Sequence, residues 1–486
     1  MLPALSDIHA EQAHRSFYEF VKLMWPVLEP GRPFVDGLHI RLICDALEKV
    51  TRGEIARLLI NLPPRHGKSN LVSILWPAWV WIDQPDRRWL TASYAQPLAE
   101  RHSTDTRRLI ESPRYQELFG HVYQLSSDVN QKARYENTHG GARIATSVGG
   151  GATGEGGDVL IIDDAHKIED ATSKTARETT IDAFTNTFST RLNPGPGKAI
   201  VVVSQRLHQR DLPGHLIETG EYTHLCLPAE YDPNHPYLHP DDPRTEPGQL
   251  LWPEMCGPAE LERRKATLGS FGAAGQLQQL PAPAGGAIFR RHWWRWYDVM
   301  PARFEQIILS VDLSFEGGIT SDYSVVQVWG KVEGDFYLLH QERERADFRQ
   351  QITLIETAVA WVETETNYSH NPAVCIEKAA NAAAIITTLR GRVRNLIPIQ
   401  PEGSKETRAV AISPTIEGGH VYIPGQPNAQ ASNYDKTRTP LWVQQFVDET
   451  AAFPAAAHDD QVDAMTQAIR RLSNPGPRIR VLGGRY

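Results

Sequence analysis

The sequence has no apolar stretch that could cross a membrane. Among its 486 residues, no run approaches the roughly 18 uninterrupted apolar residues that a spanning helix requires. The first residues, Met1–Asp7, also lack the basic segment and the following apolar segment of a secretory signal. We therefore expect a protein that stays in the cytoplasm and does not contact a membrane.

Cysteine is scarce, and its spacing is not that of a metal site or a disulfide framework. Cys44, Cys226, Cys256 and Cys375 lie far apart without any C-x-x-C pair. Zinc sites and disulfide-rich folds need closely and regularly spaced cysteines. The sequence therefore predicts neither, and we expect reduced, buried thiols.

An excess of basic residues is absent as well. The formal net charge is -8, and 41% hydrophobic with 22% charged residues is the composition of a globular protein. Net charge averages over the whole surface, so it does not exclude a local basic groove. The length predicts about two to four domains, while composition leaves the partner open.

The most informative motif that is present is a short strand leading into Gly-Lys-Ser. An aliphatic run over residues 58–60 precedes Pro63–Ser69, and the apolar segment 71–75 follows it. In such a strand, loop and helix, backbone N–H groups surround phosphates, Lys68 adds a positive charge, and Ser69 can ligate Mg²⁺. The motif predicts a site for ATP.

One residue of the full consensus is missing from this loop. Leu62 stands where G-x-x-x-x-G-K-[ST] has its first glycine, so Pro63, Pro64 and Arg65 must shape the loop. The alternative is a chance Gly-Lys-Ser in a surface turn. The apolar segments on both sides favour the phosphate loop.

A second apolar run supplies the acids that a phosphate loop needs. Residues 159–162 are aliphatic and end in Asp163 and Asp164. One acid can hold the water shell of Mg²⁺ and the other can orient the attacking water. We assign Asp163 to the metal and Asp164 to catalysis, with a strand followed by a turn as the alternative.

A third apolar run, residues 200–203, ends in Ser204 and Gln205. Polar residues at this edge of a sheet can sense the γ-phosphate, although every strand must end somewhere. We assign these two residues to the coupling of hydrolysis to movement.

The first half of the chain alternates strand-like and helical patterns, as a mainly parallel α/β sheet requires. The pattern predicts strands over 58–62, 89–93, 159–162 and 199–204, and helices over 14–28, 38–50 and 96–111. The region 231–248, rich in Pro, His and Asp, predicts an irregular insertion.

A domain boundary is predicted at residues 279–286, because this stretch of Pro, Gly and Ala cannot hold regular structure for long. Directly after it, Arg290–Tyr297 interleaves arginines with aromatic residues. Such a segment could stack on bases and hold phosphates, or its aromatic rings could pack on a domain. We favour packing.

A second α/β pattern begins at residue 306. It predicts strands over 307–312, 324–329, 336–340 and 373–377, a hairpin turn at 333–335, and helices over 347–363 and 459–472.

Carboxylates mark three elements of this second half. Asp312 and Glu377 each end an apolar strand, where an unpaired charge would be costly. The last helix opens with Asp459, Asp460 and Asp463, and the i, i+3 spacing places the last two on one face. These elements could meet around two divalent ions, as two-metal hydrolysis of a phosphodiester requires.

Separate strand-end acids and an acidic N-cap of the helix are the alternative interpretation, because Asp is favoured in a first helical turn. The order of strand, hairpin, helix, strand and helix favours a nuclease of the ribonuclease H type.

Taken together, the motifs resemble the large terminase subunit of tailed phages, the motor that packages DNA into capsids and cuts it. Residues 63–69 are similar to the variant Walker A form of that family, and residues 160–164 to its Walker B form. The resemblance continues through 204–206 as the coupling motif, 279–281 with Gly285 and Gly286 at the linker, and the acids at 312, 377 and 459–463.

The resemblance implies an α/β chain with a P-loop NTPase domain of the ASCE type at 1–280 and a linker at 281–298. A ribonuclease-H-like nuclease domain at 299–475 and a basic tail at 476–486 would follow. It also implies translocation of double-stranded DNA by a pentameric ring on the portal of a procapsid, in the host cytoplasm. A small terminase subunit would bring the viral DNA.

The resemblance adds Arg65 as a Walker A arginine that touches phosphate. The expected nucleotide-binding residues are Arg65, His66, Gly67, Lys68, Ser69, Asp163, Ser204 and Gln205. The expected metal ligands are Ser69, Asp163, Asp312, Glu377, Asp459, Asp460 and Asp463. The expected catalytic residues are Asp164, Asp312, Glu377 and Asp460. ATP with Mg²⁺ is the expected cofactor, and the nuclease would use Mg²⁺ or Mn²⁺.

Two positions depart from the family pattern. Asp164 is one methylene shorter than the usual Glu, and Glu155 stands in a glycine-rich loop where relatives often carry a basic residue. The arginine finger is therefore not assigned to one residue. The candidates are Arg143, Arg101 and Arg206.

Two other functions remain open from the sequence. One is an ATP-dependent nuclease or helicase-like enzyme of DNA repair or defence. The other is an inactive prophage remnant that serves as a binding subunit, which the intact Lys68, Asp163, Asp312 and Glu377 disfavour.

Overall fold

The computed structural model describes residues 5–150, 154–171, 173–281, 288–314, 323–378, 382–427, 434–456 and 458–474. The chain forms two compact units, Met1–Ala284 and Gly285–Tyr486. The predicted basic tail, most of the Pro-Gly stretch at the predicted boundary, and residues 151–153 of the glycine-rich loop lie outside the described residues.

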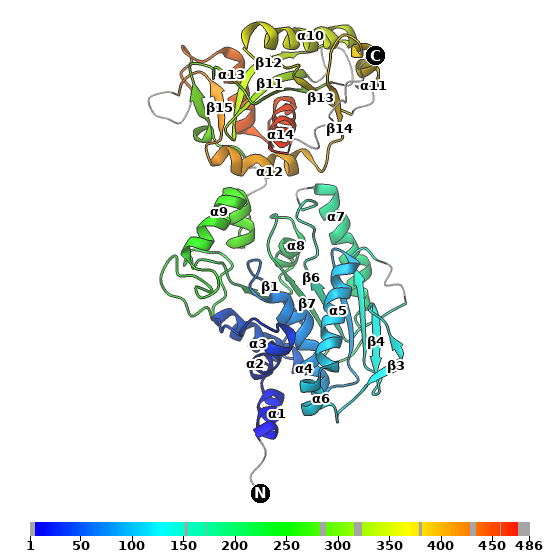
Figure 1. Cartoon of the computed structure of the whole chain (residues 1–486). Coiled ribbons are helices and arrows are strands. Elements are labelled where there is room, and N and C mark those ends of the chain that lie inside the picture. The colour runs from blue at the N-terminus through cyan, green and yellow to red at the C-terminus, as the bar shows by residue number, and fades with distance from the viewer. Residues whose placement is uncertain are drawn as a thin grey trace. The chain divides into compact units, whose positions relative to one another are not determined.

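The described part of the first unit is built on an 8-stranded sheet in the order β3-β4-β5-β2-β6-β7-β1-β8 (Figure 1). Strands β5, β2, β6, β7, β1 and β8 run parallel, and β3 and β4 are antiparallel at one edge. The strands are β1 (Arg57–Asn61), β2 (Arg88–Ser93), β3 (Leu125–Asn130), β4 (Arg134–Asn137), β5 (Ala142–Ser147), β6 (Val159–Asp163), β7 (Ala199–Ser204) and β8 (Thr223–Cys226).

Helices cover both faces of this sheet, because its central strands alternate between two apolar cores. Leu58 and Ile60 of β1 pack in one core with α2, α3 and α4, whereas Leu59 packs in the other with α8. The helices of the unit are α1 (Leu5–Arg15), α2 (Phe17–Leu28), α3 (Leu38–Thr51), α4 (Trp76–Asp83), α5 (Gln96–Glu111), α6 (Pro113–Phe119), α7 (Lys174–Ala183), α8 (Leu212–Thr219) and α9 (Pro258–Gly272).

The predicted helix over 14–28 is wrong in one respect, because the structure divides it at Ser16. The Ser16 side chain accepts a hydrogen bond from Glu19 N at 3.4 Å and caps α2. The short edge strands β3 and β4 carry few apolar residues and were not predicted. The insertion 231–248 contains neither a helix nor a strand, as predicted.

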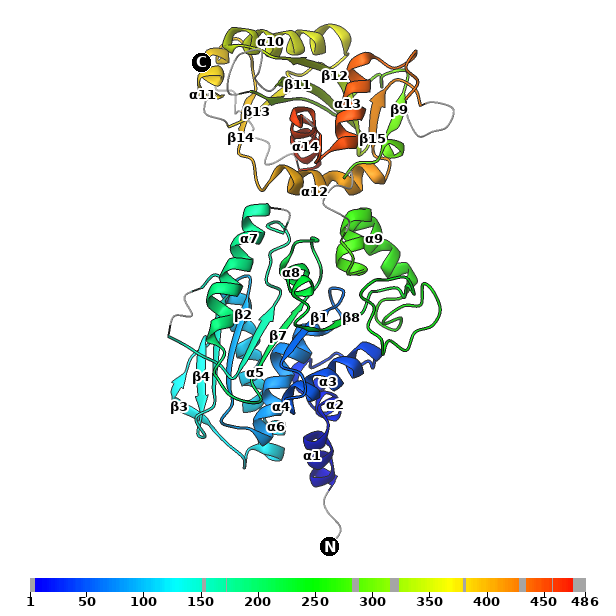
Figure 2. The same cartoon turned by 180° about the vertical axis from the view of Figure 1, so that it is seen from behind.

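The described part of the second unit is a 7-stranded sheet in the order β14-β13-β10-β11-β12-β15-β9 (Figure 2). The antiparallel strands β10, β11 and β12 are followed by β13, which pairs with β10 in parallel. The strands are β9 (Arg295–Tyr297), β10 (Gln306–Asp312), β11 (Ser324–Val332), β12 (Asp335–Glu344), β13 (Ala373–Glu377), β14 (Leu396–Ile399) and β15 (Val421–Pro424).

Helices again cover both faces of the sheet. Ile308 packs on the face of α12, α13 and α14, while Ile307 and Leu309 pack on the face of α10 and α11. The helices are α10 (Phe348–Glu365), α11 (Ala382–Leu389), α12 (Lys405–Glu417), α13 (Leu441–Ala452) and α14 (Asp460–Ser473).

Two local predictions in this unit are confirmed. The hairpin between β11 and β12 turns at Glu333 and Gly334, whose φ angles are 49° and 94°. The start of α10 is fixed by a capping box between Asp347 and Gln350.

The arginine-aromatic segment packs on the second unit, as we favoured. Trp293 and Trp294 are buried in its core, and Arg295–Tyr297 forms the edge strand β9. The predicted linker at 281–298 is therefore too long, because the large apolar rings of residues 288–297 are stabilised by burial rather than left in a tether. All four cysteines are free and buried, and the helices of the described ranges include none that is long and apolar enough to span a membrane.

Candidate active sites

The loop after β1 has the backbone shape of a phosphate cradle. Gly67 has a φ of 74° and Arg65 a φ of 66°, two left-handed conformations in a four-residue stretch that starts at Pro64. Such a conformation is uncommon for a residue with a side chain, and it recurs in tight turns and at functional sites. Arg65 therefore takes part in the turn that the missing first glycine would have eased, and its side chain is exposed.

The predicted Walker A and Walker B residues meet at the carboxyl edge of the parallel sheet. Lys68 Nζ lies 2.6 Å from Asp164 Oδ1, and Ser69 Oγ donates a hydrogen bond to Asp163 Oδ1 at 3.0 Å. Ser73 Oγ donates to the other oxygen of Asp163 at 2.7 Å. A serine hydroxyl beside a buried carboxylate is an oxygen donor set of the kind that Mg²⁺ prefers.

The two acids differ in their surroundings. Asp163 is buried and both of its oxygens accept hydrogen bonds, whereas burial and the adjacent Asp163 charge raise the pKa of Asp164, opposed by Lys68. Asp164 also has a φ of 52°, a left-handed backbone conformation that is uncommon for a residue with a side chain. A raised pKa suits a carboxylate that accepts a proton from water.

His66 is placed differently from our expectation for its side chain. The ring is buried against His39 and Trp252, its Nδ1 lies 3.0 Å from Pro64 O, and burial lowers its pKa to about 4. The side chain is thus part of the packing under the loop, because a neutral imidazole is stabilised between aromatic rings. Only its backbone remains a candidate for contact with phosphate.

Two of the three candidate arginine fingers are disfavoured as residues that act on a neighbouring subunit, because Arg143 and Arg206 are buried within the first unit. Arg143 donates to Ser73 O at 2.6 Å behind Asp163, and Arg206 forms an ion pair with Asp211 at 3.0 Å. Arg101 on α5 is exposed and stays a candidate.

Glu155 has a partner within its own unit. Its carboxylate forms an ion pair with Arg134 of β4. This contact anchors the described end of the glycine-rich loop to the edge of the sheet.

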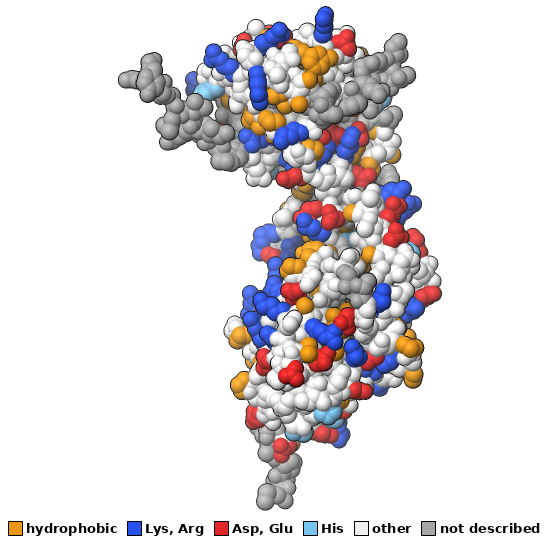
Figure 3. Space-filling view, turned by 90° about the vertical axis from the view of Figure 1, so that its right-hand side faces the viewer, with side chains coloured by type: hydrophobic (Ala, Val, Ile, Leu, Met, Phe, Trp, Pro, Cys, Tyr) orange, Lys and Arg blue, Asp and Glu red, His pale blue; other side chains and the backbone are white. Residues whose placement is uncertain are grey.

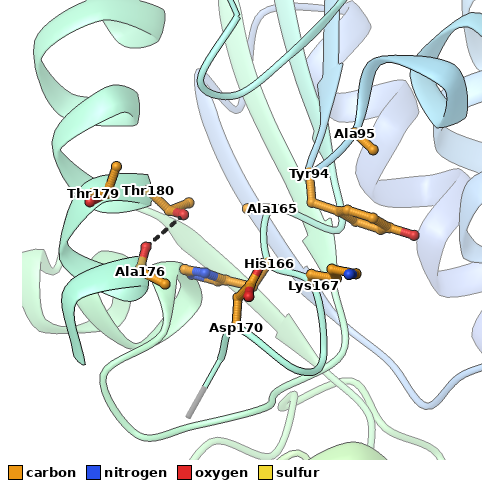
Figure 4. A pocket seen from close by; sticks show the side chains of 9 residues that line it. All are labelled: Tyr94, Ala95, Ala165, His166, Lys167, Asp170, Ala176, Thr179 and Thr180. Carbon is orange, nitrogen blue, oxygen red and sulfur yellow. Dashed lines mark hydrogen bonds between the residues drawn. The ribbon is translucent and has the colours of Figure 1, made fainter. Parts of the chain in front are cut away.

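A cavity of about 470 Å³ opens beside the Walker B strand (Figure 4). It lies between the residues that follow β2 and β6 and one face of α7, and Tyr94, Lys167 and Asp170 are among its lining residues. His166 lines it as well, and its Nε2 accepts a hydrogen bond from Leu212 N at 2.8 Å. Lys68 is not among the lining residues, whereas Ala165, which follows Asp164, is one of them.

In the second unit, the predicted acids converge on one face of the sheet. Asp312 ends β10 and Glu377 ends β13, and the two strands pair in parallel up to Val311 and Ile376. Helix α14 packs on β10 and brings Asp460 and Asp463, both buried, to the same place. The strand-end acids are therefore close enough to the acids of α14 to act on one another electrostatically.

The acids act on one another electrostatically. Burial raises the pKa of Asp312 well above its usual value, and the charges of Asp463, Glu377 and Asp460 raise it further. Burial is also the main cause of a raised pKa at Glu377. Clustered carboxylates with raised pKa values are a fitting environment for divalent cations.

Two cations that the sequence did not suggest lie among these acids. Lys405 Nζ is 2.6 Å from Asp459 Oδ1 and 2.8 Å from Asp463 Oδ2. Arg408 Nη2 is 2.6 Å from Asp463 Oδ1 and 3.8 Å from Glu377 Oε2. Both come from the first turn of α12, at the i, i+3 spacing that places them on one face.

Asp459 and Asp463 thus form ion pairs with side chains of α12. Within the described residues, no group of three or more His, Cys, Asp or Glu side chains is arranged to hold a metal ion. The Asp459 side chain does not cap α14 either. Asp459 is thus a partner of Lys405 in this conformation, and Asp463 is a partner of both Lys405 and Arg408.

A buried network of glutamines fixes α14 against the sheet. Gln467 Nε2 donates to Ser310 Oγ at 2.8 Å and to Cys375 O at 3.1 Å, next to the two strands that carry the acids. Gln461 donates to Glu449 at 2.6 Å and accepts from Gln341 at 2.9 Å. Sequence patterns treat these polar residues as surface positions, so this network was missed.

The fold and the two sites define a class. A parallel sheet with a phosphate loop between β1 and the next helix, and paired acids after β6, is a P-loop NTPase fold. In the second unit, β10, β11 and β12 form an antiparallel meander, and β13 pairs with β10 in parallel. Acids lie at the ends of β10 and β13 and at the start of α14. This arrangement is a ribonuclease-H-like fold. The predicted fold class is confirmed.

Comparisons with known proteins agree with this class. Residues 309–472 match the family model described as the terminase RNaseH-like domain. The whole chain resembles a large terminase from a thermophilic bacteriophage, with 13% identity and a TM-score of 0.51 over 94% of this chain and 99% of that one. A search of curated proteins found no match.

Two further solved structures match with lower TM-scores. The large terminase of bacteriophage HK97 has 12% identity and a TM-score of 0.37 over 93% of this chain and 99% of that one. The magnesium-bound large terminase nuclease of the thermophilic phage G20c has 20% identity and a TM-score of 0.27, covering 39% of this chain and 99% of that one. The similarity to the whole-chain terminase with a TM-score of 0.51 confirms the resemblance to large terminases at the level of the fold.

Proposed function

We propose that this protein is the large subunit of a phage DNA-packaging motor, which hydrolyses ATP to translocate double-stranded DNA and cuts that DNA with a metal-dependent nuclease. One observation carries the proposal. A single chain with the fold of a large terminase joins a Walker A and Walker B site to a unit that matches the terminase nuclease model and gathers four acids.

In the first unit, the chain's own residues divide the work on ATP. Lys68 and the backbone N–H groups of the loop bind the phosphates, and Ser69 with Asp163 holds Mg²⁺. When bound, the metal would supply positive charge that offsets the charge of the phosphates. Asp164 accepts the proton of the attacking water, since its raised pKa brings it closer to the working pH.

In the second unit, Asp312, Glu377, Asp460 and Asp463 are the proposed metal ligands, with Mg²⁺ or Mn²⁺ as the metal. When bound, such ions would supply an activated water and offset the charge that develops on the leaving oxygen of the phosphodiester. Lys405 and Arg408 orient Asp463 and offset part of the charge of the acids. The glutamine network keeps α14 in register with the two strand ends.

A net charge of -8 leaves DNA binding to local surfaces. Figure 3 shows basic and acidic side chains interspersed, with a group of Lys and Arg along one edge of the first unit. The exposed Arg101 and Arg108 of α5 are candidates for phosphate contacts. The proposed partners are double-stranded DNA, a portal protein, a small terminase subunit and further copies of this chain in a pentameric ring in the host cytoplasm.

Double-stranded DNA should stimulate the ATPase, and this test separates a packaging motor from a helicase-like enzyme. We expect ATP turnover by the full chain to rise several-fold with linear duplex DNA and much less with single-stranded DNA of the same length. A packaging motor contacts the phosphate backbone of duplex DNA, whereas the side chains of a helicase stack on the bases of a single strand. Preferential stimulation by single-stranded DNA would favour the repair or defence enzyme.

A further inference from the structure

The end of β7 is attached to both sides of the ATP site. Ser204 O accepts hydrogen bonds from Leu62 N at 3.3 Å and from Asn61 Nδ2 at 3.1 Å, just before the phosphate loop. Asp164 N donates to Val203 O at 2.9 Å. A change of position at the Walker A or Walker B side therefore acts on the same strand end.

A third attachment leads from this strand end toward the end of the first unit. Arg206 N donates a hydrogen bond to Oε1 of Gln279 at 3.0 Å, and Nε2 of Gln279 donates to Gln276 O at 2.5 Å. Gln279 is fully buried, although it lies only two residues before the last described residue of this unit, Pro281. Its φ of 55° is a left-handed conformation that persists only where the surroundings hold it.

The turn 273–277 packs closely against the segment that follows β7. A Cβ atom at Gly275 would lie 3.1 Å from Arg206 O, so a glycine lets the turn 273–277 pack directly on the segment after β7. Arg206 is itself held by the ion pair with Asp211 and by carbonyl groups of the following turn. A displacement of this segment would therefore move Gln279 rather than be absorbed.

We propose that Gln279 is the residue that couples the nucleotide site to residues 276–281, the last described segment of the first unit. The proposal rests on the proposed ATPase function. The Gln279 amide accepts from the strand end and donates to its own turn, so the position of Arg206 N is passed to the backbone of residues 276–281. Gln279 does not touch the nucleotide, and its role is positioning rather than catalytic.

Hydrogen exchange of the full chain tests this proposal. Amide exchange of residues 273–281 is measured by mass spectrometry in Mg²⁺, with and without saturating ATPγS, alongside the affinity for ATPγS. In the unsubstituted protein we expect the nucleotide to change the exchange rate of this segment about fivefold, the factor for one hydrogen bond of about 1 kcal/mol. In Gln279→Met the change should vanish while the affinity stays within about twofold of the original value, because a single neutral contact outside the site is lost.

Three further variants make the result specific. Gln278→Met is the matched control, because the Gln278 side chain bonds to Glu230 and not to the segment after β7, and it should keep the full response. Gln279→Glu keeps the acceptor for Arg206 N but loses the donor to Gln276 O, so it should restore only part of the response. Gly275→Ala forces the two segments apart and should reduce the response with Gln279 intact.

The outcomes separate this proposal from the proposed function. A full nucleotide response in Gln279→Met would overturn the coupling role, and so would an equal loss in Gln278→Met. Failure of the unsubstituted protein to bind ATPγS would instead overturn the ATPase function, and the coupling role with it.

Discussion

Replacing Lys68 with alanine should lower ATP turnover by about 10²–10³, the range for removal of one preorganised charged donor from a transition state. Lys68 is the buried cation of the Walker A loop, and its Nζ lies 2.6 Å from Oδ1 of the proposed catalytic Asp164. Its loss removes the positive charge that faces the developing charge on the phosphates. Steady-state release of phosphate by the full chain measures the effect.

The matched control for this prediction is Lys198→Ala. Lys198 also forms an ion pair of 2.6 Å with an aspartate, Asp158, but at the opposite edge of the same sheet. We expect its removal to leave turnover within about twofold, because partly exposed ion pairs contribute only about 1 kcal/mol to stability. Equal turnover in Lys68→Ala and the original protein would remove Lys68 from the site.

Replacing Asp312 with asparagine should lower plasmid nicking in Mg²⁺ or Mn²⁺ by about 10³ or more, since metal-based charge stabilisation is worth several kcal/mol. Asp312 is half-buried, and burial together with the charges of Asp463 and Glu377 raises its pKa. An asparagine keeps the shape of the side chain but removes one charge that holds the ions. The conversion of supercoiled to nicked plasmid measures the effect.

In the absence of divalent ions, Asp312→Asn should stabilise the second unit, although the same substitution lowers nicking. The folded-state pKa of Asp312 is raised, so the folded chain binds more protons than the unfolded chain above the unfolded pKa of about 4. In EDTA, the second unit should therefore lose stability as the pH rises through the folded pKa. Asp312→Asn should weaken this pH dependence and unfold at a higher urea concentration at neutral pH.

Asp335→Asn is the control for both effects. Asp335 lies at the start of β12, away from the acids, and pairs with His420 on the surface. It should leave nicking and the pH dependence of unfolding nearly unchanged. Undiminished nicking by Asp312→Asn would contradict the assignment of the metal site.

Much of the fold could be predicted because it depends on local patterns. The strands that carry the sites are uninterrupted apolar runs, and the turn at Glu333 and Gly334 has a strong local signal. The edge strands β3 and β4 lack this signal, because they are short, partly exposed and stabilised mainly by pairing. The break at Ser16 was missed, since an apolar pattern runs through it.

The residues of the two candidate sites could likewise be predicted only where a local motif marks them. Motif spacing was enough to bring Lys68, Asp163 and Asp164 together, because each ends or begins an element of one parallel sheet. The partners Lys405 and Arg408 could not be found this way, since only tertiary packing decides which side chains of α12 face the acids. The Ser404 side chain caps the start of this helix, and neither the helix nor its orientation was predicted.

The most direct test of the whole account is a DNA-packaging assay. The full chain, ATP, Mg²⁺ and linear double-stranded DNA are mixed with procapsids that carry a portal or lack one, and DNA protected from nuclease is measured. We predict protection only with the portal and ATP, and none with Lys68→Ala. Protection that is absent with every procapsid offered from the cognate phage, or equal without a portal, would contradict a packaging motor.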